Sequence, residues 1–451
     1  MFRVRYFLSI PLAWLIVGST AAAQDFYEAL AATYLTNPTL LASRAELRAV
    51  NESVPQELAN YRPFVSLDGE AGVQEIDRNR GDGSETTYPF AASIGLSQPL
   101  YRGGRTTADV ARAEAEVQTQ RATLRSVEQG VLLDAVTAYM DVWRDEDVLR
   151  LNINNEMVLA RQLQATNDRF EVGELTRTDV AQAESRLSRA TAERIGTEGD
   201  LTGSQAVFEE IIGAPPVSVA APGPVQGLPY TEIDAISAAQ QDNPDISAAV
   251  FAEQAAQDRV RSSIGELYPV ISLSAELLHS ENQFSGDSET DAARVLAIVS
   301  IPLYQQGFVS SQVREDKQAA NQRRIEIIET RRRIRQECTD AWAQLITARA
   351  QIRSFTDETR ATRIALEGVR EENSVGQRTI LDVLDAEQEF LDAQISLTRA
   401  RRDETVASFV VLQCLGRLTA ADLALPVEIY DPDADYQAVR NRWFGLTAPG
   451  E

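Results

Sequence analysis

Apolar and polar positions alternate in four short segments of the chain, which are arranged as two pairs. In the first segment, Val65, Leu67 and Ala71 fall on one side, whereas Ser66 and Asp68 fall on the other. A period of two is typical of a β-strand with one apolar face, and segments of this length can cross a bilayer. The alternation is weaker in the last segment, where two apolar residues fall on the polar side. The predicted strands span about residues 63–74, 89–101, 269–280 and 291–303.

A long heptad pattern follows each pair of predicted strands. Between Thr106 and Asp168 the sequence has one glycine and no proline, and apolar residues recur every seven positions from Val110 to Ala138. A second such pattern begins at Val313. A helix of this length spans about 90 Å, and a sustained heptad requires partner helices in a left-handed supercoil. Shorter return helices are predicted at residues 178–212 and 379–415.

Short motifs recur along the chain at an almost constant spacing. Asn37-Pro38 is found again as Asn243-Pro244, 206 residues later. Such self-similarity indicates a duplicated structural unit. The motifs Val172-Gly173 and Asp179-Val180 recur 203 residues later as Val375-Gly376 and Asp382-Val383. We predict two tandem helix-strand-helix units at residues 24–213 and 230–416, a Pro/Gly/Ala-rich linker at 214–229, and a C-terminal periplasmic segment at 417–451.

The N-terminus has the features of a secretory signal peptide. Arg3 and Arg5 precede a short apolar stretch, and Ala21-Ala22-Ala23 fits a cleavage site before Gln24. A membrane anchor is the alternative, but the apolar stretch is short and ends in small residues. We therefore predict that residues 1–23 are removed during export.

The number of predicted strands constrains how the chain enters a membrane. Four strands cannot close a barrel, and an open sheet edge is not tolerated in lipid. Two chains would supply eight strands, whose side chains fill the interior, whereas three chains supply twelve and leave a lumen. A soluble four-stranded sheet is the alternative. Aromatic residues lie where a membrane girdle is expected: Tyr61, Phe64, Tyr101, Tyr268 and Tyr304 at one end, and Tyr88, Phe90 and Phe284 at the other.

The composition argues against catalysis and nucleic-acid binding. The formal net charge is −24, and an acidic chain binds nucleic acid poorly. The one histidine, His279, has no local partner for catalysis or metal binding, and no phosphate-binding or dinucleotide motif is found. We expect no enzyme activity, cofactor or metal site. Cys338 and Cys414 could pair after export, but we expect two small, buried core residues.

The turns between the predicted helices carry recognisable motifs. Phe170-Glu171-Val172-Gly173 precedes Thr178-Asp179-Val180 in the first unit, and Ser374-Val375-Gly376 precedes a similar stretch at 379–386 in the second. With the Asn-Pro near the start of each unit and the strand pair before each long helix, they resemble the periplasmic tips of TolC-family outer-membrane factors. The resemblance covers essentially all of the mature chain.

The resemblance implies a fold, a location and partners. Members of that family are homotrimers with a twelve-stranded β-barrel in the outer membrane of Gram-negative bacteria and a twelve-helix barrel across the periplasm. They are passive ducts for type I protein secretion or small-molecule efflux. An inner-membrane ABC or proton-driven transporter supplies the energy, and a periplasmic adaptor joins the two. The sequence alone leaves the cargo open.

The resemblance also implies roles for residues at the tips. Asp382 and Asp385 match luminal acidic rings of the family, and Arg378, Thr178 and Asp179 match a network that holds the tips closed. Asn373 stands where the family often has tyrosine, so this chain lacks the phenol contact of that network. Val172, Gly173, Val375 and Gly376 are the tip motifs expected to contact the adaptor.

Simpler interpretations of the same features remain open at this point. Asp179 and Asp382 follow Thr178 and Thr379, and acids in a first helical turn behind a threonine cap stabilise a helix without any luminal role. A soluble periplasmic coiled-coil adaptor or structural protein is the alternative function. That alternative leaves the strand pairs unexplained, and no lipoyl-like β-domain is evident.

Overall fold

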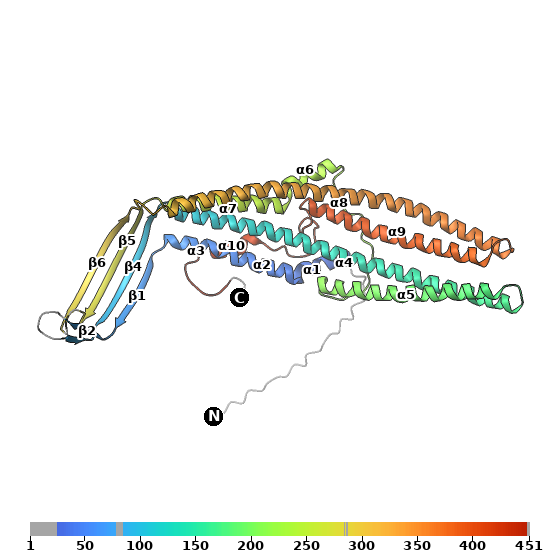
Figure 1. Ribbon diagram of the computed structural model, residues 1–451, viewed down its shortest axis with the longest axis horizontal. Coiled ribbons are helices and arrows are strands. Elements are labelled where there is room, and N and C mark those ends of the chain that lie inside the picture. The colour runs from blue at the N-terminus through green and yellow to red at the C-terminus, as the bar shows by residue number, and fades with distance from the viewer. Residues whose placement is uncertain (1–24, 78–83, 284, 286, 449–451) are drawn as a thin grey trace, which may run out of the picture.

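The protein is an elongated rod with a small β-sheet at one end and long helical hairpins at the other (Figure 1). This computed structural model describes residues 25–77, 84–283, 285 and 287–448. The predicted signal peptide at residues 1–23 lies outside the described residues. Within the described part of the chain, no helix is both long enough and apolar enough to cross a membrane.

The elements follow one another in two similar series. The helices are α1 (Phe26–Thr36), α2 (Pro38–Asn51), α3 (Ser53–Leu58), the 3-10 helix η1 (Ala59–Tyr61), α4 (Arg105–Glu171), α5 (Arg177–Ile212), α6 (Glu232–Asp242), α7 (Pro244–Gly265), α8 (Phe308–Ser374), α9 (Ile380–Cys414) and α10 (Pro432–Arg440). The strands are β1 (Phe64–Ala71), β2 (Gln74–Asp77), β3 (Ser84–Thr87), β4 (Phe90–Arg102), β5 (Val270–Glu281) and β6 (Glu289–Ser300).

The main sheet is antiparallel, with the strand order β1-β4-β5-β6. The structure adds a hairpin, β2–β3, in a region that the sequence analysis treated as a loop. The strand predicted to reach residue 303 ends at Ser300. Pro302 lacks a backbone N–H and cannot continue the ladder, which accounts for the shorter strand.

The strand register collects the apolar residues on one side of the main sheet. Leu67 lies opposite Ile94, Ile94 opposite Leu277, and Leu277 opposite Ala293. Residues directly opposite each other share a face, so these four form one apolar row across the sheet. We call this side the apolar face; it also includes Val65, Leu96, Leu273, Val295 and Val299.

The two Asn-Pro motifs begin equivalent helices and anchor equivalent helix ends. The side chain of Asn37 caps α2 and donates a hydrogen bond of 3.0 Å to the carbonyl of Ile211 near the end of α5. Asn243 caps α7 and donates one of 3.0 Å to the carbonyl of Cys414 at the end of α9. Each asparagine side chain thus caps the start of one helix and also pairs with a backbone carbonyl near the end of another helix.

The largest apolar core lies midway along the rod and joins the first series to the second. The ring of Tyr139 on α4 packs edge-on against Phe26 of α1, with centroids 5.1 Å apart, and contacts Phe208 of α5. Phe26 also contacts Phe409 of α9. These large side chains are almost fully buried, so the middle of the rod holds the hairpins together.

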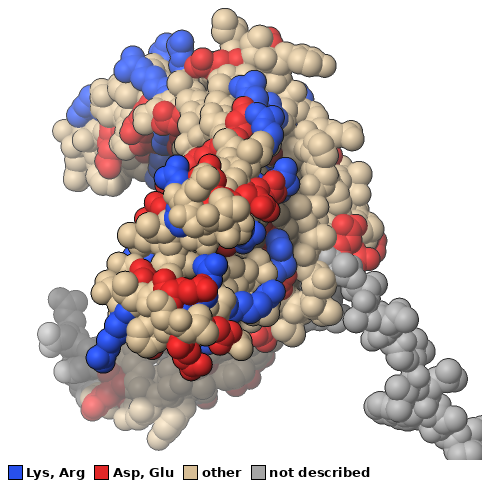
Figure 2. Space-filling model, turned by 90° about the vertical axis from the view of Figure 1, so that its right-hand side faces the viewer, with Lys and Arg blue, Asp and Glu red and all other residues tan. Residues whose placement is uncertain are grey.

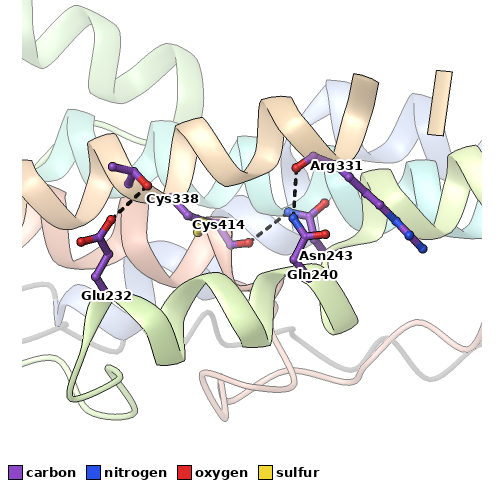
Figure 3. The surroundings of a disulfide bond; sticks show 7 residues. Glu232, Gln240, Asn243, Arg331, Cys338 and Cys414 are labelled. Carbon is purple, nitrogen blue, oxygen red and sulfur yellow. Dashed lines mark hydrogen bonds between the residues drawn. A yellow bond between two sulfur atoms is a disulfide. The ribbon is translucent and has the colours of Figure 1, made fainter. Parts of the chain in front are cut away.

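A disulfide bond joins Cys338 of α8 to Cys414 at the end of α9 (Figure 3). The expectation of two small core residues is right about burial, since they are 1% and 8% exposed, but the pairing that it treated as the less favoured alternative is present. Their Cα atoms lie 5.5 Å apart, a separation that suits a disulfide. That distance depends on how α8 packs against α9, which the spacing of the cysteines does not reveal.

Candidate functional site: the helix tips and the sheet surface

The turns that connect the hairpin helices lie at the end of the rod farthest from the sheet (Figure 1). Gly173 and Gly376 have φ angles of 80° and 79°, in the left-handed region that favours glycine. Each follows an exposed valine; Val172 is 72% exposed and Val375 is 69% exposed. The two predicted tip motifs therefore form similar turns that present an apolar side chain to solvent.

Each return helix begins with a capping box. The hydroxyl of Thr176 accepts from the backbone N–H of Asp179, whose carboxylate accepts from the N–H of Thr176 at 2.8 Å. Thr379 and Asp382 repeat this arrangement. The cap of the first hairpin is thus Thr176 and not Thr178, because the reciprocal bonds need a spacing of three residues.

These hydrogen bonds also affect the acids at the tips. The backbone N–H of Thr176 lowers the pKa of Asp179, with its hydroxyl contributing next. The hydroxyl and then the backbone N–H of Thr379 lower the pKa of Asp382. Both carboxylates are therefore ionised at neutral pH, as a charged ring or a helix cap would require.

Arg378 and Asp385 at the tips also have partners within the same chain. The Nε of Arg378 donates to Glu372 at 2.9 Å, and the Nδ2 of Asn373 donates to the backbone carbonyl of Arg378 at 2.8 Å. Arg186 of α5 forms an ion pair with Asp385 of α9, which joins the two hairpins. Seen from the tip end, acidic and basic side chains are interspersed (Figure 2).

The expected network of Arg378, Thr178 and Asp179 does not form within this single chain. Arg378 instead forms an ion pair with Glu372, and Asp179 is engaged in the cap of its own helix. Asp382 lies in the first turn of α9 and Asp385 one turn later, as expected. The sequence analysis missed Arg186, which has no local signal because its partner is 199 residues away.

Aromatic residues are exposed at the junction between the sheet and the helices. Tyr61, Phe64, Tyr268 and Tyr304 are all exposed there. Trp443, in the segment after α10, also lies at this junction. The guanidinium carbon of Arg62 lies 4.7 Å from the centroid of its ring. Trp443 is 65% exposed, and sequence reasoning missed it because the segment carries no periodic pattern. Phe284, expected at the opposite end, lies outside the described residues.

His279 corrects a further expectation of the sequence analysis. Its Nδ1 lies 2.8 Å from the carboxylate of Asp291, and its Nε2 lies 3.3 Å from Glu281. The histidine therefore has two acidic partners at the far end of the sheet. Asp291 is directly opposite His279 on the neighbouring strand, so the pairing register would have revealed this contact.

Comparisons with known proteins agree with this architecture. The sequence profile of the family described as outer membrane efflux protein matches residues 30–214 and again residues 235–417. The outer membrane efflux protein BepC of Brucella suis biovar 1 is 35% identical over 435 residues, which cover 96% of this chain and 94% of BepC. The outer membrane protein TolC of Escherichia coli K12 is 24% identical, covering 90% of this chain and 85% of TolC.

Solved structures share the fold at lower sequence identity. The outer membrane channel CmeC of Campylobacter jejuni superposes with a TM-score of 0.80 at 13% identity, over 92% of this chain and 89% of CmeC. The outer-membrane channel OprN gives 0.77 at 19% identity, over 87% and 89% of the two chains. The long helices, the small sheet and the two matched segments lead to one assignment: the chain belongs to the outer membrane efflux protein family, the TolC-like outer-membrane factors.

Proposed function

We propose that this protein is the passive outer-membrane duct of a tripartite export system. The main sheet crosses the outer membrane and the helices extend into the periplasm. A periplasmic adaptor connects the tips to an inner-membrane ABC or proton-driven transporter. The names of the relatives support both cargo classes, since BepC is an efflux protein and AprF of Pseudomonas aeruginosa an alkaline protease secretion protein.

The proposed assembly is a homotrimer with one twelve-stranded barrel. The observation that carries it is the apolar-faced sheet, in which the described part of β1 pairs only with β4 and that of β6 only with β5. Two open edges are incompatible with lipid unless other copies complete the sheet. Native mass measurement of the detergent-extracted protein should give three chains. A fully active monomer or dimer would contradict the trimer.

The two tandem units at residues 24–213 and 230–416 remain part of the proposal. In support, α4 and α8 have 67 residues each, and the family profile matches twice. The linker is 214–229, and the 417–451 segment stays on the periplasmic side. The mature chain should begin at Gln24, after removal of residues 1–23, which N-terminal sequencing of protein from the outer membrane will test.

Asp382 and Asp385 are proposed to line the periplasmic constriction. Three chains would bring six carboxylates together, and crowded like charges concentrate cations. The double substitution Asp382→Asn with Asp385→Asn should lower cation selectivity and block by multivalent cations in planar bilayers. Asp392→Asn, also on α9, is the matched control and should change neither property. Unchanged selectivity in the double variant would reduce these acids to helix-capping and ion-pairing residues.

Arg378 is proposed to hold the closed tips by reaching Asp179 or Thr178 of a neighbouring hairpin. Such a bond contributes about 1.5–3 kcal/mol when shielded but under about 1 kcal/mol when solvated. Arg378→Ser should raise single-channel conductance without lowering trimer yield. Arg360→Ser removes a solvent-exposed i,i+3 pair on α8 and is the control. If Arg378→Ser conducts like the parent, Arg378 serves only the turn with Glu372.

The adaptor is proposed to bind the tip turns through Val172, Gly173, Val375 and Gly376. The two valines are exposed, and the glycine after each adopts the same backbone conformation in both hairpins. Val172→Asp with Val375→Asp should reduce cross-linking to the adaptor in cells, because a charge would be buried in the contact. Val217→Asp, at an exposed valine of the linker, should leave cross-linking intact. Equal loss in both variants would argue against a tip-specific contact.

A further inference from the structure

Four polar side chains gather where the apolar face of the sheet ends. His279 on β5 lies opposite Asp291 on β6, and Glu281 lies opposite Glu289. All four occupy the same side of the sheet as Leu277, at the strand ends remote from the helices (Figure 1). This cluster is separate from the tips and from the aromatic junction, and no part of the proposed duct function uses it.

The donor atoms of this cluster are close enough to share one ion. One ligand atom each from His279, Glu289 and Asp291 lies within 4.8 Å of the other two. A metal bound at about 2.1 Å keeps two of its donors within roughly 4.2 Å of each other. Small rotations of the side chains would therefore bring the three donors onto a common ion, and the carboxylates of Glu289 and Asp291 are exposed.

The charge balance at this position favours a cation. Three carboxylates surround one imidazole, and among the described residues no lysine or arginine forms an ion pair with them. The cluster borders an apolar surface, where unbalanced negative charge is costly. This free-energy cost depends on the proposed placement of the sheet in the membrane. The distances between the donor atoms do not depend on it. A divalent ion would offset the formal charge of two of these carboxylates beside a neutral imidazole.

We propose that His279, Asp291 and Glu289 form a binding site for a divalent transition-metal ion at the outer end of the sheet. An imidazole nitrogen with two carboxylate oxygens suits zinc or copper, whereas magnesium and calcium prefer oxygen ligands alone. Glu281 lies beside the other ring nitrogen and orients the imidazole. The site is complete within one chain and does not depend on the trimer.

His279 is the single histidine of the sequence, which gives the experiment its specificity. Mature protein without a polyhistidine tag is titrated with Cu²⁺ in detergent, in an Asp382→Asn, Asp385→Asn background that removes the two acids proposed to line the periplasmic constriction. Pulsed electron paramagnetic resonance then detects the remote nitrogen of a coordinated imidazole. We expect one Cu²⁺ per chain with this signature and none in His279→Asn.

The carboxylates distinguish a built site from a lone histidine. Asp291→Asn with Glu289→Gln should weaken Cu²⁺ binding by about tenfold or more, while Glu70→Gln on the opposite face should have no effect. Equal affinity in the double variant, or no imidazole signature in the parent, would overturn the proposal. Because the measurement needs neither a membrane nor conduction, a failed duct assay would leave its result intact.

Discussion

The α4/α5 and α8/α9 hairpins have helices of similar length but are stabilised by different interactions. Both have a 67-residue outgoing helix and a capping box at the return. Ala135 and Ile211, 203 residues before Cys338 and Cys414, pack in or against the large central core. The cysteines belong to a much smaller cluster and are covalently bonded. One backbone unit can thus be stabilised by core packing in one copy and by a cross-link in the other.

Removing the cross-link should have the largest effect on this comparison. The bond closes a segment of 76 residues, and loop-closure entropy for that length corresponds to roughly 4.5 kcal/mol. Cys338→Ala with Cys414→Ala should therefore accelerate hydrogen exchange in α8 and α9 far more than in α4 and α5. Ile211→Ala is the counterpart in the first hairpin and should affect α5 instead. Uniform acceleration in both hairpins would mean that they are stabilised as one unit.

Charges introduced on the apolar face should have the next largest effect. That effect should be the same for the strands of the first series and those of the second. Arginine at a lipid-facing midplane position costs about 2–4 kcal/mol in a barrel. Leu67→Arg and Leu273→Arg should each reduce the amount of protein recovered from the outer membrane. Glu70→Arg, on the polar side of β1, should not. The opposite ranking would show that the lipid-facing and water-facing sides are exchanged.

The capping boxes should respond equally in the two hairpins. Thr176→Ala and Thr379→Ala should each destabilise the first turn of their helix by about 1 kcal/mol, measured by hydrogen exchange. Thr178→Ala is the control and should have little effect. The pKa values of Asp179 and Asp382 are lowered, so their contribution is complete above the ordinary value of 3.8 and is lost as the pH falls through the lower folded value. A larger effect at Thr178 would contradict the assigned cap.

The smallest expected effect concerns the ion pair between the hairpins. Arg186 and Asp385 are partly exposed, so the pair contributes under about 1 kcal/mol and less at high salt. Arg186→Gln should broaden the distribution of distances between spin labels on the two tips. Arg189→Gln breaks a pair within α5 and should leave the distribution unchanged. Identical distributions in both variants would mean that the pair does not restrain the tips.

The features that the sequence predicted arise from long, regular patterns. The heptads running from Val110 and Val313 specify helices, and the alternation around Leu67 specifies a strand with one apolar face. The features that the sequence did not predict depend on how distant segments of the chain are aligned. The disulfide requires the packing of α8 on α9, and the partner of His279 requires the β5–β6 register. The β2–β3 hairpin has only four residues per strand, too few to produce a clear alternation.

The oxidation state of Cys338 and Cys414 also indicates whether a given molecule has left the cytosol. Thiols stay reduced in the cytosol, and disulfides form after export to an oxidising compartment. A thiol-alkylating reagent added to denatured cells will therefore label two sulfurs on retained precursors and none on exported chains. The labelled fraction reports, from one residue pair, how quickly newly made copies leave the cytosol and complete their second hairpin.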